Sequence, residues 1–282
     1  MRQVKPAAKV EANFRKRMGM LWDEVLTPVT ERIKQAIQSG ADLEHIASLI
    51  QDALRQSETI YNMRVDEIVT LWSLSLETST RRIFEQSLRQ SLGVDTRAVL
   101  DDPAIKGNLQ LARIEAAKLV TDVTKQQIGL IAKAVADNSY GKLPDGVSLM
   151  DRIQQIEKMP KQRAKLIARD QTSKMTAKLN QIRQQSIGVE IYVWKNVRDN
   201  RVVGNPSGLY PIGNDKHGNH WIMEGLYCRW DDPTVYSTDK GKTWKKRIPE
   251  MPKNHPGEDI QCRCYTQPII DIDRLIAEAE VV

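Results

Sequence analysis

The chain has 282 residues and a mass of 32.1 kDa, with 40% hydrophobic and 28% charged residues and a formal net charge of +6. This composition excludes a fibrous, collagen-like or wholly disordered chain, and the length allows one large or two modest domains. Three cysteines cannot all pair within one chain, which favours plain thiols or metal ligands over a disulfide framework.

Neither a membrane span nor a signal peptide is expected. The best uncharged run, residues 68–76, is too short for the roughly 20 apolar residues that a spanning helix needs. The N-terminus is basic, but Glu11 and the charged residues 15–17 occupy the place of an apolar signal core. We therefore expect a soluble chain that stays on the cytoplasmic side and binds no membrane.

Apolar residues at helical spacing, bounded by caps and breakers, dominate the first two thirds of the chain. Thr27 and Pro28 are typical of a helix start, and Asp42 and Ser148 are candidate N-caps. Pro160 is expected to end one helix and begin the next. The pattern predicts helices over residues 28–39, 42–54, 58–90, 102–137, 148–159 and 160–188.

The last third has a different composition. After Gly188 the chain holds all three cysteines, three of the four histidines and four of the six tryptophans, and its charges nearly cancel. Alternating β-branched and aromatic residues predict a strand at 189–194, with further extended segments at 221–230 and 265–270 and a hairpin over 236–244. A short amphipathic helix is expected over the tail, residues 271–282.

These patterns predict an α+β protein with a long, mainly helical N-terminal part followed by a small, β-rich and loop-rich C-terminal domain. We place a helical docking arm at residues 1–146 and a second domain at residues 147–282. The second domain comprises the helices of 148–188, the compact part 189–270 and the tail.

Basic residues gather on one stretch of the predicted helices, against a single acid, Asp170. Two interpretations stay open: a docking stripe for phosphate or an acidic protein surface, and an ordinary solvated helix face. No aromatic residue is interleaved, so base stacking is not expected. The stripe contains Lys158, Lys161, Lys165, Arg169, Lys174 and Lys178.

The C-terminal part contains more candidate metal ligands than one zinc ion needs, because zinc takes four nitrogen or sulfur donors. The spacing fits no standard Cys-x2-Cys pair, so packing and hydrogen bonding of the same side chains remain an alternative to metal binding. Cys228 lies in an apolar stretch and is assigned to the core. The candidate set, of which four would suffice, is His217, His220, His255, Cys262 and Cys264.

We assign no catalytic residue. A Cys–His nucleophile needs a third, orienting group, and a His–Asn–His nuclease needs a further acidic or histidine partner that the spacing does not supply. A metal-dependent nuclease or toxin-like enzyme is kept only as a lesser alternative.

A series of short motifs runs in a fixed order through residues 167–172, 188–194, 199–202, 220–225, 230–233, 255–256 and 262–264. In this order, above all in the His-Pro and Cys-Arg-Cys ending, residues 147–270 resemble the phage Mu F-like minor head proteins, also called phage head morphogenesis proteins. Upstream of this region the likeness extends only to helical character.

The resemblance implies a low-copy virion protein inside the capsid of a tailed bacteriophage. Such a protein associates with the portal and with capsid or scaffold proteins, aids head assembly, DNA packaging or delivery, and has no known enzymatic activity. Family members often carry Arg-x2-His or Cys-x2-Cys where this chain has His217-x2-His220, so both zinc binding and hydrogen bonding remain open at that position. A nucleic-acid-binding module is the alternative function, because the first 188 residues carry a net charge of +7.

Overall fold

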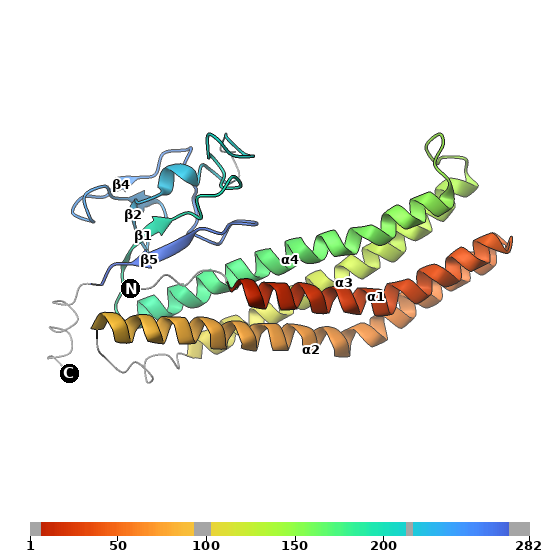
Figure 1. Ribbon diagram of the computed structural model, residues 1–282, viewed down its shortest axis with the longest axis horizontal. Coiled ribbons are helices and arrows are strands. Elements are labelled where there is room, and N and C mark those ends of the chain that lie inside the picture. Colours follow the sequence, from red (N-terminus) through yellow and green to blue (C-terminus); the bar gives the residue numbers. More distant parts are fainter. Residues whose placement is uncertain (1–6, 93–102, 213–216, 271–282) are drawn as a thin grey trace. The chain divides into compact units, whose positions relative to one another are not determined.

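The computed structural model describes residues 7–92, 103–212 and 217–270 (Figure 1). Four long helices come first: α1 (Ala8–Gln38), α2 (Leu43–Leu92), α3 (Pro103–Ser139) and α4 (Leu149–Ser186). The strands that follow are short, and they are separated by turns and long loops. The α+β class predicted from the sequence is confirmed. The later elements are β1 (Ile191–Lys195), the 3-10 turn η2 (Trp221–Met223), β2 (Tyr227–Arg229), β3 (Val235–Tyr236), β4 (Lys245–Lys246) and β5 (Tyr265–Pro268).

The chain divides into two compact units, each assembled from separate segments. One contains residues 9–74 and 111–169, and the other contains the described residues within 1–8, 75–110 and 170–282. The sequence predicts two consecutive domains that divide at residue 146. The two compact units are not consecutive in this way, because α2, α3 and α4 each contribute residues to both.

The first unit, residues 9–74 and 111–169, is helical and buries an apolar stripe from each helix. Phe14 of α1 stacks on Trp72 of α2 with ring centroids 4.9 Å apart. Ile33 of α1 and Val120 of α3 are fully buried. Burial of whole side chains of this size, at about 1.5–3 kcal/mol each, is what stabilises such long helices.

Pro28 and Pro160 lie inside helices, so the helix boundaries predicted at these two residues are wrong. Helix α1 runs through Pro28 from Ala8, and α4 runs through Pro160 from Leu149. Proline lacks the N–H that would bond the carbonyl four residues earlier. At Pro160 the Gln127 side chain supplies the missing donor, because its Nε2 lies 2.7 Å from the Ile156 oxygen.

The second unit contains residues 170–186 of α4 and the β-rich lobe, residues 189–270. Arg183 of α4 is fully buried, where its guanidinium binds the Glu77 carboxylate and donates to Thr80 Oγ1 at 2.8 Å. Burial lowers the pKa of Arg183, and the Glu77 charge opposes that shift. Farther along, Gln184 joins the lobe, donating to Thr266 Oγ1 at 3.0 Å and accepting from Trp230 Nε1 at 3.2 Å.

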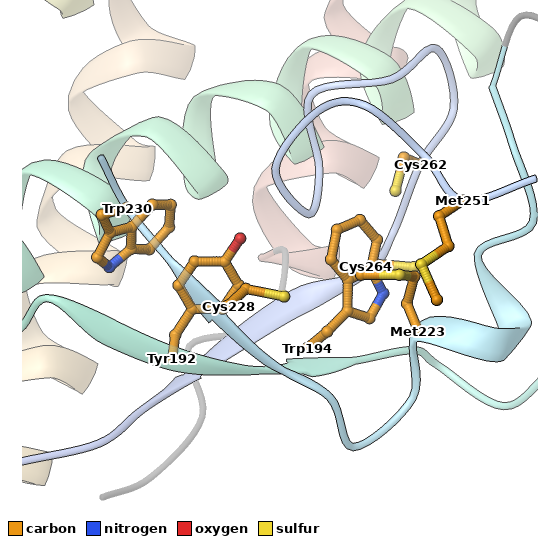
Figure 2. Close-up of a cluster of buried hydrophobic side chains, with 8 residues drawn as sticks. All are labelled: Tyr192, Trp194, Met223, Cys228, Trp230, Met251, Cys262 and Cys264. Atoms are coloured by element: carbon orange, nitrogen blue, oxygen red, sulfur yellow. The ribbon is translucent and has the colours of Figure 1, made fainter. Parts of the chain in front are cut away.

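A three-stranded antiparallel sheet in the order β2–β1–β5 forms the centre of the lobe. Tyr192 of β1 pairs with Cys228 of β2, and Trp194 pairs with Thr266 of β5. Tyr192, Trp194 and Cys228 are fully buried, so Cys228 belongs to the core as predicted (Figure 2).

The predicted hairpin forms between β3 and β4. Its turn places Lys240 and Gly241 at φ of 62° and 85°, the left-handed region that glycine adopts readily. Asp239 accepts hydrogen bonds from Thr243 and Ser237, which hold the pKa of its carboxyl well below the usual value.

The remaining predicted elements differ from the structure in detail. Residues 221–230 form a 3-10 turn and a short strand rather than one extended segment, because Gly225, at φ of 85°, turns the chain between them. Helix α2 is continuous across the predicted gap at residues 55–57. The tail expected to be helical, residues 271–282, lies outside the described residues.

Candidate metal centre

Two short backbone segments deliver the side chains of the candidate site. His220 precedes the 3-10 turn η2, and Asn219 fixes that turn by accepting from the N–H groups of Trp221 and Ile222 at 3.0 and 3.2 Å. Cys262 and Cys264 stand just before β5, one residue apart, so both thiols reach the same buried space. Both segments belong to the second compact unit.

His220, Cys262 and Cys264 bring their donor atoms within 4.8 Å of one another, and all three are buried. His220 Nδ1 lies 3.4 Å from Cys262 Sγ and 3.6 Å from Cys264 Sγ. Zinc–nitrogen bonds of about 2.0–2.1 Å and zinc–sulfur bonds of about 2.3 Å place the N and S corners of one tetrahedron about 3.6 Å apart. The separations therefore fit a shared metal ion, and this group can bind one.

The second nitrogen of His220 fixes the orientation of its ring. Nε2 lies 2.9 Å from the carbonyl oxygen of His217 and 3.2 Å from Asp259 Oδ2. The His217 oxygen is an acceptor, so Nε2 carries the proton that is donated to it, and the carboxylate charge of Asp259 lies beside that N–H. When Nε2 is the protonated nitrogen of a neutral imidazole, the lone pair is on Nδ1, which faces the two sulfurs; carboxylate–histidine–metal triads use this arrangement.

The surroundings of the thiols also suit bound thiolates. The backbone N–H of Gly257 points at Cys262 Sγ from 3.4 Å. Gly257 has a φ of 89°, and a Cβ there would lie 2.6 Å from Ala177 Cβ, so the close approach requires glycine. Cys264 packs beside Met223 and Met251 in the core of the lobe (Figure 2).

The ionisation of the group is coupled. Burial alone lowers the pKa of His220, but hydrogen bonds with Asp259 and Cys262 raise it to about 10. The pKa of Cys262 is lowered, chiefly by its hydrogen bond with Cys264, while that bond and burial raise the pKa of Cys264. Thiols and imidazole bind a metal in their deprotonated forms, so metal binding to this group releases protons and its affinity depends on pH.

Asp259 was not identified from the sequence as part of the site. Burial raises its pKa, but hydrogen bonds with His220 and Asn254 outweigh that effect and leave the pKa below its usual value. The Asn254 amide donates to Asp259 Oδ1 at 2.8 Å. One indication in the sequence that Asp259 belongs to the site is its position three residues before Cys262. The sequence does not reveal which histidine Asp259 faces.

The other two candidate histidines lie apart from this group. His217 Nδ1 is 3.5 Å from Asp259 Oδ1, and the His217 side chain brings no donor atom into the group. His255 Nδ1 is 2.8 Å from the Tyr192 hydroxyl, and its ring packs 5.0 Å from that of Trp230. The structure thus brings together three of the five predicted ligands.

The predicted basic stripe lies along α4. Lys158, Lys161, Lys165 and Lys178 are exposed, whereas Arg169 and Lys174 are half-buried. Lys161 Nζ is 3.5 Å from Asp23, and Lys174 forms an ion pair of 2.9 Å with Asp170. Within the described residues, no helix is long and apolar enough to cross a lipid bilayer.

Comparison with known proteins finds a distant similarity. The chain is 26% identical over 194 residues to an uncharacterized protein of Haemophilus influenzae, a match that covers 68% of this chain and 36% of that protein. The matched part thus spans about a third of the relative's length. No family of known proteins matches the chain, and no solved structure matches it either.

Proposed function

We propose that the protein is a structural, non-enzymatic minor head protein of a tailed bacteriophage, similar to the Mu F-like proteins, and that one zinc ion stabilises its C-terminal lobe. It assembles in the host cytoplasm with the portal protein and with major capsid or scaffold proteins. In the virion it lies inside the capsid at the portal vertex, where it aids head assembly, DNA packaging or delivery.

One observation carries this proposal: the segments whose motifs underlie the resemblance contact one another, at the motif residues or directly beside them. Asp170 of α4 accepts the backbone N–H of Gln261 at 2.7 Å, immediately before Cys262. Arg263 pairs with Asp199 at 2.5 Å. A catalytic site directs its reactive groups towards a substrate, whereas these groups connect α4, the loop at 199–202 and the start of β5. This pattern supports an architectural role.

Zinc is the favoured metal because the donors are one imidazole and two thiolates, and because zinc needs no particular geometry beyond a tetrahedron. The strands of the lobe have only two to five residues each. A small, loop-rich lobe gains much of its stability from such a cross-link, since the free energy of metal binding adds to that of folding.

Co-purification tests the assembly role. The full chain is co-expressed with the portal and major capsid proteins encoded by the same genome, and we expect it to co-purify with the portal. A variant with Lys158, Lys161 and Lys165 replaced by serine is expected to bind less. The matched control replaces Lys245 and Lys246 of β4, which are also exposed. Absence of portal binding by the unaltered chain would contradict the proposed role.

Contact with packaged DNA is a second candidate function, favoured by the exposed lysines of α4. Lysines that bind phosphates release counterions, so the logarithm of the affinity falls linearly with the logarithm of salt concentration. Electrophoretic shift across a salt series, with two unrelated duplexes, should give the same negative slope for both. Binding that does not change with salt would rule out the phosphate interpretation.

A further inference from the structure

A cavity of about 410 Å³ in the second compact unit borders the metal centre. His220, Cys262 and Cys264 all line it. Its other walls include Tyr210 and Ile260, which are 55% and 66% exposed, so the cavity opens to solvent. The metal-binding group thus forms part of the wall of an open cavity, although its three side chains are largely buried.

Within the part of the chain that the structure describes, three side chains supply donors to this centre. Across residues 7–92, 103–212 and 217–270, no further histidine, cysteine, aspartate or glutamate brings a donor atom into the group. Oδ1 of Asp259 accepts the Asn254 amide, and Oδ2 lies 3.2 Å from Nε2 of His220, the ring nitrogen opposite the one that faces the sulfurs. Met223 and Met251 pack near Cys264, but a neutral thioether is a ligand for copper(I) rather than for zinc.

We propose that the fourth coordination position of the metal faces this cavity and takes an exchangeable ligand from outside the protein. The inference rests on the zinc binding proposed above and extends it. Zinc with four protein ligands is closed, whereas zinc with three keeps a water or another small ligand in the fourth position.

The charges and walls of the site define the ligand class. Two thiolates neutralise the divalent ion, so a neutral donor binds without leaving a buried net charge. Zinc favours nitrogen and sulfur donors, and Tyr210, Ile212 and Ile260 provide an apolar rim. The site therefore suits a small, uncharged nitrogen base of the imidazole type, which displaces the resting water.

Cobalt(II) substitution tests the open position directly, because the visible spectrum of cobalt reports its ligands. The full chain is loaded with cobalt(II) and titrated with imidazole. We expect a saturable spectral change with one imidazole per metal and with the cobalt retained. The 1,3-dimethylimidazolium ion, which has the same ring but no free lone pair, is the control and should change nothing.

Variants then locate the ligand. Ile260→Trp narrows the cavity mouth and should weaken the imidazole response without changing the affinity for cobalt. A cobalt spectrum that imidazole does not alter would overturn the proposal and show that the protein closes the site. If His217→Ala then made the spectrum responsive, His217 would be the fourth ligand. Failure of the chain to bind cobalt or zinc would overturn the zinc proposal itself, a different result from a closed site.

Discussion

Replacing Asp259 by asparagine tests whether the orientation of His220 matters for metal binding. The carboxylate lies 3.2 Å from Nε2 of His220, and the carbonyl oxygen of His217 lies 2.9 Å from the same atom. Loss of such an outer partner typically lowers metal affinity 10- to 100-fold, or by about 1.4–2.8 kcal/mol. Since the His217 carbonyl remains, we expect the lower end of this range, about tenfold.

Competition with a chromophoric zinc chelator at neutral pH measures this affinity. Asp231→Asn is the matched control, because Asp231 is an exposed aspartate of the same lobe that pairs with Arg229. It should bind zinc like the unaltered chain, whereas His220→Ala should lose far more affinity than Asp259→Asn. Equal zinc affinity of Asp259→Asn and the unaltered chain would refute the reasoning about the imidazole orientation.

Three further predictions concern the fold. Gln127→Met removes the donor to the Ile156 oxygen and should lower the free energy of unfolding by about 1–3 kcal/mol. The loss should be smaller in a chain with Pro160→Ala, which restores a backbone N–H; urea unfolding of the unaltered chain, both single variants and the double variant measures the difference. Arg183→Met leaves the Glu77 carboxylate without its buried partner and should cost about 3–5 kcal/mol, partly recovered by adding Glu77→Gln, again measured in urea. Asp239 has a lowered pKa in the folded chain, so its stabilising effect is present above about pH 4 and is lost as the pH falls; the thermal midpoint of Asp239→Asn should therefore decline less on acidification than that of the unaltered chain.

Helical periodicity in the sequence was sufficient to predict most of the helical residues, but not the helix ends at proline. Pro28 and Pro160 are ordinary start and stop residues by local rules. At Pro160 the continuation of the helix involves a tertiary partner. The carbonyl oxygen of Ile156 accepts a hydrogen bond from the side chain of Gln127, which is 29 residues away in the sequence. No local sequence pattern predicts that hydrogen bond.

The candidate site was predictable in its ligand types and less so in its geometry. Cys262 and Cys264 share a buried space because one residue separates them just before a strand. Which histidine joins them depends on loop conformation: Gly218, at φ of 67°, packs against the backbone of Met251 and Pro252, ahead of His220. His255 has an equally plausible spacing but hydrogen-bonds the Tyr192 hydroxyl instead.

The zinc content of the purified full chain tests the central claim most directly. Elemental analysis after exhaustive dialysis should find about one zinc ion per chain, as expected for a single tetrahedral site. Cys264→Ser should lose that zinc and unfold more easily, while Cys228→Ser, which changes a buried thiol outside the group, should keep it. A chain that contains no zinc after purification with zinc supplied, and whose stability is unchanged in Cys264→Ser, would contradict the account.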